Sequence, residues 1–329
     1  MSNQERDPVE TVLTEPRMPG GVEILEPREV PLGGPRALPV RRTLPQRARS
    51  LVGAWCFVDS YGPVPIHDER GERAGTMDVP PHPHTGLQTV SWLYAGEIEH
   101  RDSAGSHALI EPGQVNLMTA GAGIQHSEVS TTAARELHGV QLWIALPDRS
   151  RHLAPFFESF SPAPVTVGDA TLRVFVGTLA GASSPVSTFT GLVGAQLDLP
   201  AGGVVELAVD ETFEHGLVVD AGTPRLQGVE IPTTQLGVVP AGAGVLRIEA
   251  GDTALRGLVI GGEPLGESIV MWWNFVGRSH DEIVAFREQW QREVIEGRDA
   301  AGRFGTVSGY SGAALPAPEL PNVRLQPRG

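Results

Sequence analysis

Residues 81–94 read PHPHTGLQTVSWLY, and this stretch decides the kind of fold that we expect. Pro81 and Pro83 hold their own φ angles near extended values, and Pro83 also keeps His82 out of the helical region. The apolar run that follows has the length of a strand and ends before Gly96. The stretch therefore predicts extended, β-rich structure rather than a helix.

Short apolar runs bounded by turn residues recur along the rest of the chain. The first half contains Ser50–Val58 and Gln141–Leu146, and the second half contains Leu172–Val176, Val204–Val209 and Val245–Ile248. The 40 glycines and 28 prolines are scattered between such runs, as expected for tight turns between strands. The pattern predicts an all-β protein of two tandem barrels or sandwiches of similar size, without a strict sequence repeat.

One helix is predicted near the C-terminus. Ser279 and Glu282 have the spacing of a capping box, and the apolar residues that follow recur at helical spacing. The apolar stripe consists of Ile283, Phe286, Trp290 and Val294, and Gly297 ends the helix. We expect this helix to pack on a barrel.

We expect five segments along the 329 residues of the chain. They are a flexible tail at 1–20, an N-terminal barrel at 21–148, a linker at 149–165, a C-terminal barrel at 166–277, and a helix with an extended tail at 278–329. A chain of this length can bury a separate core in each barrel.

Composition excludes several classes of function. The chain carries 39 acidic against 25 basic residues and a formal net charge of −14, so it would repel nucleic acids and anionic membranes. Cys56 is the single cysteine, which rules out an intramolecular disulfide and leaves mainly nitrogen and oxygen ligands for a metal. Residues 1–20 lack the apolar segment of a signal peptide, and no apolar run approaches the roughly 18 residues of a membrane span. We therefore expect a cytoplasmic protein with no direct nucleic-acid or membrane partner.

Two doublets of metal-ligating residues indicate a metal site. His82 and His84 on one extended segment, and His126 and Glu128 on another, have the i, i+2 spacing of residues that share one face of a strand. Two facing strands can therefore bring both doublets to a single ion. Three imidazoles and one carboxylate suit Fe(II), Mn(II), Ni(II), Co(II) or Zn(II), and on an octahedral ion they leave two positions for substrate and O₂.

The same spacing occurs elsewhere without this meaning. The doublet His67–Glu69 lies in a charged loop, and His280–Glu282 lies at a helix start, where positions i and i+2 do not face each other. His100 and His107 flank a turn, and we expect both to be solvated. His215 has no potential ligand two residues further on and is isolated in the second half of the chain.

Several other residues are candidates for parts of the site. Unbroken strand alternation from His84 predicts that Gln88, Val90 and Trp92 face inward with it. His138 precedes a strand, and we interpret it as a core or hydrogen-bonding residue rather than a ligand. The apolar residues Trp55, Phe57 and Met118 are candidates for pocket walls, with a role in the core as the favoured reading.

At these residues the chain resembles the pirin family, whose members are bicupins. Residues 81–90 resemble the family signature HPHxGxExV, and residues 118–128, MTAGAGIQHSE, resemble MTAGxGIxHSE. Residues 99–105 resemble the family's hairpin, and residues 138–143, HGVQLW, resemble its HGxQLW strand. Weaker similarity reaches residues 28–63 and the helix at 279–294, so the resemblance covers most of the chain.

The resemblance implies two tandem, jelly-roll-like cupin barrels with the metal in the N-terminal one. It implies His82, His84, His126 and Glu128 as ligands, the same set that strand alternation selects. One divalent metal is expected, Fe(II) foremost, with Mn, Ni, Co, Cu and Zn as alternatives. Gln88 stands where the motif has Glu, which removes one potential base near the site. The C-terminal barrel is expected to be a metal-free cupin that supports or covers the first.

The resemblance also implies a metal-dependent dioxygenase of the quercetin 2,3-dioxygenase type. A small aromatic or enolic substrate would meet O₂ at the metal, and Glu128 would be the catalytic residue that accepts the substrate's hydroxyl proton. A second hypothesis is a non-enzymatic, redox-dependent regulator that binds a transcription factor or a metabolic enzyme. A cupin isomerase or small-molecule binder is the third and weakest hypothesis.

Overall fold

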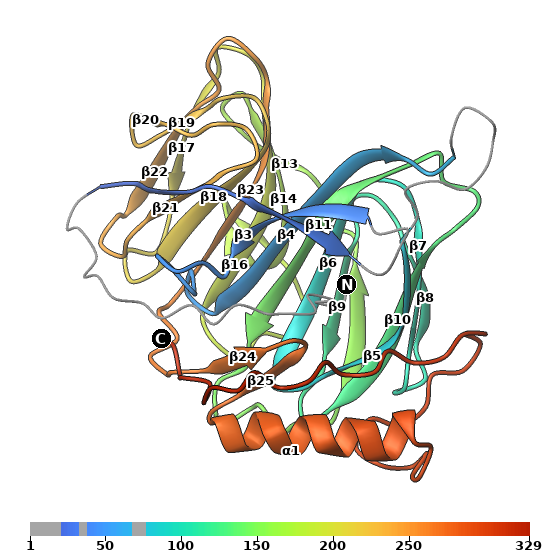
Figure 1. The fold of residues 1–329 in the computed structure, drawn as a ribbon. Coiled ribbons are helices and arrows are strands. Elements are labelled where there is room, and N and C mark those ends of the chain that lie inside the picture. Colours follow the sequence, from blue (N-terminus) through green and yellow to red (C-terminus); the bar gives the residue numbers. More distant parts are fainter. Residues whose placement is uncertain (1–20, 33–37, 68–76) are drawn as a thin grey trace.

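The computed structural model describes residues 21–32, 38–67 and 77–329 (Figure 1). Two β-barrels lie side by side, and the C-terminal helix runs beneath the right-hand one in the view of Figure 1. The predicted all-β architecture with one C-terminal helix is therefore confirmed. The tail predicted at residues 1–20 lies outside the described residues.

The first barrel combines a seven-stranded and a four-stranded antiparallel sheet. The larger sheet has the order β12 (Phe156–Phe160), β9 (Val115–Thr119), β6 (Leu87–Ala95), β11 (Glu136–Ala145), β4 (Trp55–Pro65), β3 (Leu38–Leu44), β2 (Arg28–Leu32). The smaller sheet has the order β5 (Asp78–His84), β10 (Ile124–Ser130), β7 (Ile98–Asp102), β8 (His107–Ile110). Strands β5 and β10 carry the two doublets singled out in the sequence.

The second barrel repeats this arrangement. Its larger sheet has the order β1 (Glu23–Leu25), β21 (Leu236–Val239), β18 (Glu214–Ala221), β23 (Leu255–Gly262), β16 (Leu192–Leu199), β14 (Ala170–Leu179), β13 (Val165–Val167), with β15 (Ala182–Ser183) paired to β14. Its smaller sheet has the order β17 (Val204–Ala208), β22 (Val245–Glu249), β19 (Arg225–Leu226), β20 (Val229–Glu230). In the order of strands within the smaller sheet, β17 and β22 thus occupy the positions that β5 and β10 occupy in the first barrel.

Two segments pair outside the ranges expected for them. Strand β1 lies within the range expected for the N-terminal barrel, yet it pairs with β21 of the second barrel. Strand β12 lies within the expected linker, yet it pairs with β9 of the first barrel. Each barrel therefore completes its larger sheet with a strand from beyond its expected boundary.

The two larger sheets pack against each other through a shared hydrophobic core. Trp92 of β6 stacks on Phe175 of β14 with ring centroids 4.7 Å apart, and Val90 belongs to the same cluster as Leu258 of β23. The prediction that Val90 and Trp92 face inward with His84 is therefore wrong. Between β5 and β6 the chain passes through Gly86 at φ +67°, where the alternation shifts by one residue. A Cβ at this position would lie 2.4 Å from the carbonyl oxygen of Val276, so only glycine fits.

The C-terminal helix covers the end of the first barrel, as predicted. Helix α1 (His280–Trp290) begins at Ser279, whose hydroxyl accepts the Glu282 backbone N–H at 3.2 Å, and it continues as the π-helix η2 (Gln291–Ile295). The predicted stripe buries Ile283, Phe286 and Trp290 against the hairpin β24 (Val270–Trp272) and β25 (Phe275–Gly277). Within the described residues no helix has the length and apolar character needed to cross a membrane.

Candidate metal centre

The two predicted doublets lie on neighbouring strands of the smaller sheet in the first barrel. Strands β5 and β10 pair antiparallel with His126 directly opposite His82, so these two side chains share a face of the sheet. A β-bulge follows His126, and Glu128 lies opposite His100 of β7 on the other side of β10. The register thus brings histidines from three strands to one buried face.

Three imidazoles converge within this face. One donor nitrogen from each of His82, His84 and His126 lies within 4.8 Å of the other two, and all three residues are 0% exposed. The closest pair is Nε2 of His84 and Nε2 of His126, 3.0 Å apart. Nε2 of His82 is buried and has no hydrogen-bond partner. Buried polar atoms are nearly always paired, so this cluster has the donor set and the orphaned atom that a bound cation would satisfy.

Backbone carbonyls set the orientation of two of the rings. Nδ1 of His82 donates to the carbonyl oxygen of Pro80 at 2.8 Å, and Nδ1 of His84 donates to the carbonyl oxygen of Asn274 at 3.2 Å. With Nδ1 protonated, each Nε2 keeps its lone pair, as a metal ligand requires. Asn274 joins β24 and β25, so a segment beyond the second barrel orients a side chain of the first.

Burial keeps the three imidazoles neutral. Desolvation lowers the pKa of His82, His84 and His126 well below the ordinary histidine value, and the neighbouring histidines lower the pKa of His84 and His126 further. A protonated imidazole has no lone pair for a metal. The site is therefore ready to bind a cation at neutral pH without first losing protons.

Glu128 lies on the β7 side of the three imidazoles. One oxygen of its buried carboxylate lies within 4.8 Å of donor nitrogens of His100 and His126, and Oε1 lies 3.5 Å from the Ser91 hydroxyl, which donates to Gln141 at 2.8 Å. Among the described residues the potential ligands form two groups that share His126: one holds His82 and His84, and the other holds Glu128 together with His100, which was not a predicted ligand. A set of three imidazoles and one carboxylate fits a divalent metal of the first transition row.

His100 is the residue that the sequence analysis placed wrongly. We expected it to be solvated, but it is 2% exposed, with Nδ1 3.3 Å from Nδ1 of His126 and Nε2 3.1 Å from Oδ2 of Asp102. Although burial opposes it, hydrogen bonds from His100 and Ser106 lower the pKa of Asp102, which stays ionised. His107 is exposed, as expected, and contacts Glu99 at 2.8 Å.

The missed signal was present in the sequence. His100 and Asp102 have i, i+2 spacing with Ile98, and all three are buried on one face of β7 while the residues between them are partly exposed. If His126 binds a metal through Nε2, its Nδ1–H is free to donate to His100, whose Nε2–H donates to Asp102. This chain of hydrogen bonds holds the third imidazole as the carbonyls hold the first two.

Gln88 does not lie at the cluster. Its amide donates to the Thr119 hydroxyl at 2.9 Å and to the carbonyl oxygen of Ser187 at 3.0 Å, on the face of β6 that meets the second barrel. The inward position expected for Gln88 is wrong, for the same reason as that of Trp92. The presence of glutamine instead of the motif glutamate at position 88 therefore does not remove a base from the imidazole cluster, contrary to our expectation.

Aromatic side chains form one wall of the site. Phe57 stacks on Trp143 at 4.0 Å between ring centroids, and Trp143 meets His84 in a T-shaped arrangement with centroids 5.1 Å apart. Met118 belongs to the same buried cluster. Trp55 faces the second barrel instead, where its indole N–H donates to the carbonyl oxygen of Gly261 at 3.0 Å.

Two further expectations concern Cys56 and His138. Cys56 is buried, and burial raises the pKa of its thiol to about 12; it lies in an apolar cluster with Phe57 and Trp143 and in neither group of potential ligands. His138 hydrogen-bonds Oδ1 of Asp220 in the second barrel through Nε2 at 2.6 Å. This bond confirms His138 as a hydrogen-bonding residue.

Comparison with known proteins gives consistent matches along the chain. The pirin family profile matches residues 37–144, and the profile of the pirin C-terminal cupin domain matches residues 194–296. A Pseudomonas aeruginosa protein with the provisional name quercetin 2,3-dioxygenase is 38% identical over 295 residues, which cover 89% of each chain. A pirin-like protein of Caulobacter vibrioides is 34% identical over 288 residues, covering 85% of this chain and 94% of that protein.

Solved structures show the same architecture. A crystal structure of quercetin 2,3-dioxygenase from Acinetobacter baumannii matches with a TM-score of 0.82 and 38% identity, covering 92% of this chain and 97% of the other. A second structure of that name and organism matches with a TM-score of 0.73 and 25% identity, covering 82% and 96%. The predicted pair of cupin barrels is thereby confirmed. By its two domain profiles and its relatives over most of its length, the chain belongs to the pirin family.

Proposed function

We propose that this protein is a metal-dependent dioxygenase of the quercetin 2,3-dioxygenase type, which opens flavonol-like substrates with O₂. The buried cluster of neutral imidazoles beside a carboxylate is the observation that carries the proposal. The names of relatives at 38% identity support the reaction class. The ligands are His82, His84, His126 and Glu128, and the expected metal is Fe(II), with Mn, Ni, Co, Cu and Zn as alternatives.

The metal's contribution is Lewis acidity, which lowers the pKa of a bound enolic hydroxyl and makes the substrate more reactive toward O₂. The chain's own residues supply orientation and proton transfer. Glu128 accepts the hydroxyl proton, and the Ser91 hydroxyl lies 3.5 Å from its Oε1. Asp102 and His100 hold the ring of His126.

The aromatic wall is suited to a flat substrate. Trp143 lies beside His84, whereas the Phe57 ring behind it is covered by Trp143 and by the Arg42 guanidinium, so Trp143 is the aromatic ring that a planar flavonol would meet. The apolar side chains around Trp143 also exclude water. Because water is excluded, the electrostatic attraction between the Glu128 carboxylate and the proton that it accepts is stronger. In the overall reaction both oxygen atoms of O₂ enter the products, and one carbon of the flavonol leaves as CO.

The test is aerobic turnover of quercetin by protein loaded separately with each of the six metals. We expect loss of the flavonol absorption, with O₂ consumed and CO released in equal amounts. Glu128→Gln keeps the size of the side chain but accepts a proton poorly, so it should lower kcat more than it raises KM. Absence of turnover with all six metals would overturn the proposal.

The regulatory alternative makes a different prediction from the same site. It requires no turnover, and it requires a protein partner that binds one oxidation state of the iron-loaded protein and not the other. The charge of −14 favours a basic protein surface as the partner. Pull-down experiments with oxidised and reduced protein distinguish this role from the dioxygenase.

A further inference from the structure

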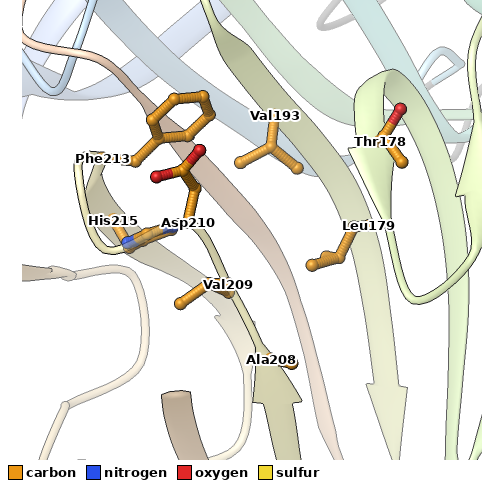
Figure 2. A pocket seen from close by; sticks show the side chains of 8 residues that line it. All are labelled: Thr178, Leu179, Val193, Ala208, Val209, Asp210, Phe213 and His215. Atoms are coloured by element: carbon orange, nitrogen blue, oxygen red, sulfur yellow. The ribbon is translucent and has the colours of Figure 1, made fainter. Parts of the chain in front are cut away.

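The second barrel contains a cavity of ≈ 230 Å³ (Figure 2). Its walls come from the end of β14, the start of β16, the end of β17, the start of β18 and the turn between β17 and β18. These strand ends meet at one end of the barrel. Since β17 and β18 hold the places of β5 and β6 in the strand order, this end corresponds to the one that holds His84 in the first barrel.

His215 gives the cavity an unusual polar wall. The residue is 1% exposed, and neither of its ring nitrogens has a hydrogen-bond partner. Buried polar side chains are nearly always paired, so two orphaned nitrogens on one ring indicate a missing partner. Figure 2 shows the imidazole beside Asp210 and Phe213 at the cavity.

The charge state of His215 limits the chemistry of that partner. Burial lowers the pKa of His215 to about 4, so the ring is neutral at physiological pH and has one N–H donor and one acceptor nitrogen. A hydroxyl group, which both donates and accepts, is complementary to either nitrogen.

The carboxylate at the rim disfavours anions. Asp210 is exposed, and Oδ1 accepts the backbone N–H of Thr212 at 2.9 Å and its hydroxyl at 2.6 Å. These hydrogen bonds lower the pKa of Asp210, which therefore stays charged. A ligand that carried its own carboxylate would be repelled at the entrance.

The remaining walls and the size favour a single aromatic ring. Leu179, Val193, Val209 and Phe213 line the cavity with apolar surface. Its volume of ≈ 230 Å³ lies between the about 150 Å³ that holds benzene and the about 300 Å³ at which pockets begin to hold drug-sized ligands. One substituted ring fills this volume.

We propose that this cavity is a second ligand site, which binds a neutral phenol or a similar hydroxylated single-ring aromatic. The hydroxyl bonds His215, and the ring packs between Phe213 and Val193. The site lies in the other barrel from the imidazole cluster and does not depend on the proposed dioxygenase reaction.

The test uses phenol as the probe, with benzene and benzoate as matched compounds. Calorimetry on the full, metal-loaded chain should show saturable phenol binding in the millimolar range or tighter, and weaker binding of benzoate. Methyl resonances of Leu179, Val193 and Val209 should shift on titration with phenol. Shifts confined to the first barrel, or no saturable binding at millimolar phenol, would overturn the proposal.

Variants at His215 separate the hydrogen bond from the apolar cavity. His215→Leu should weaken phenol binding about tenfold while benzene binding stays within about threefold, because only the hydrogen bond is lost. His215→Gln, which retains a donor and an acceptor, should recover part of the phenol affinity. Equal phenol affinity in wild type and His215→Leu would contradict the assignment of His215.

Two controls complete the design. Ala208→Trp, at an exposed position of the rim, should block all probes without disturbing the core. His82→Ala combined with His126→Ala should abolish quercetin turnover but leave phenol binding intact, whereas His215→Leu should leave quercetin turnover intact and weaken phenol binding about tenfold. Failure of the ligand site and failure of the dioxygenase proposal are thereby distinguishable.

Discussion

The smaller sheets of the two barrels share a strand order but carry opposite chemistry on their inner faces. In the first barrel, β5, β10 and β7 present polar side chains: His82, His84, His126, Glu128, His100 and Asp102. In the second, β17, β22 and β19 present aliphatic ones: Val205, Leu207, Leu246, Ile248 and Leu226. One framework thus supports either a donor cluster or an ordinary hydrophobic core, depending on the inward residues of three strands.

The difference teaches where this fold tolerates polar groups. The smaller sheet of the second barrel gains stability from burial of aliphatic surface, whereas that of the first buries polar groups, which costs free energy. The first barrel offsets that cost through the carbonyls of Pro80 and Asn274 and through Asp102, each of which bonds one imidazole. The predictions below test this contrast, beginning with the largest expected effect.

Removal of two imidazoles should abolish metal binding. His82→Ala with His126→Ala leaves one imidazole of the three-histidine group, and we expect a loss of metal affinity greater than about 100-fold. Elemental analysis after dialysis measures it. The matched variant Leu207→Ala in the second barrel should retain the metal but lose about 2–5 kcal/mol of unfolding free energy in urea. Equal metal content in both variants would contradict the contrast.

Loss of the hydrogen bond behind His126 should weaken the site without destroying it. His100→Leu removes the partner of Nδ1, and we expect metal affinity to fall about 10- to 100-fold. Competition with a chelator of known affinity gives the value. His107→Leu, at an exposed position on β8, is the control and should leave the affinity unchanged.

The imidazole cluster should make the metal-free protein sensitive to acid. The pKa values of His82, His84 and His126 are lowered in the folded state, so below the ordinary value near 6.5 the unfolded chain binds more protons than the folded one. The free energy of unfolding should therefore be largest above that pH and decline as the pH falls below it. Urea titrations across this range measure the decline.

The matched variants for this pH effect lie in the two barrels. His82→Gln should reduce the slope of stability against pH. His215→Leu removes one histidine of the second barrel, whose pKa is also lowered, to about 4. The cluster of three histidines in the first barrel stays intact in this variant. A slope that neither substitution changes would show that other groups control the acid sensitivity.

The smallest effect is expected at Gln88. Because its side chain faces the second barrel, Gln88→Glu should leave metal affinity within about twofold of wild type, whatever it does to stability. The same chelator competition measures it. A loss of metal affinity as large as that expected for His100→Leu would show that the residue at position 88 does affect the metal centre.

Much of the site could be read from local sequence. The spacing of His82 with His84 and of His126 with Glu128 predicts shared faces, because side chains alternate along every strand. The capping residue Ser279 and the apolar stripe that follows it likewise predict α1, because a helix repeats every 3.6 residues. Such rules need no knowledge of distant neighbours.

The wrong predictions concern residues whose orientation or burial is set by contacts with other segments of the chain. Gly86 adopts its left-handed conformation under the carbonyl of Val276, and the turn there shifts the alternation that we extended from His84 to Trp92. His100 was judged by the turn next to it, but its burial follows from the pairing of β7 with β10. The Gly86 contact leaves no mark within its own segment, whereas the i, i+2 spacing of Ile98, His100 and Asp102 was a local sign of the buried face of β7.

The amino-acid sequence by itself determined the β-rich character of this protein, its acidic charge, the two doublets and the helix cap, since these follow from backbone sterics and side-chain spacing. Only the tertiary structure decided that His100 joins the cluster, that Asn274 orients His84, and that β1 completes the second barrel. Those outcomes depend on the competition among sheet edges and apolar faces far apart in the chain. Which contacts form is decided by the free energy of the whole folded molecule, and no single segment determines it.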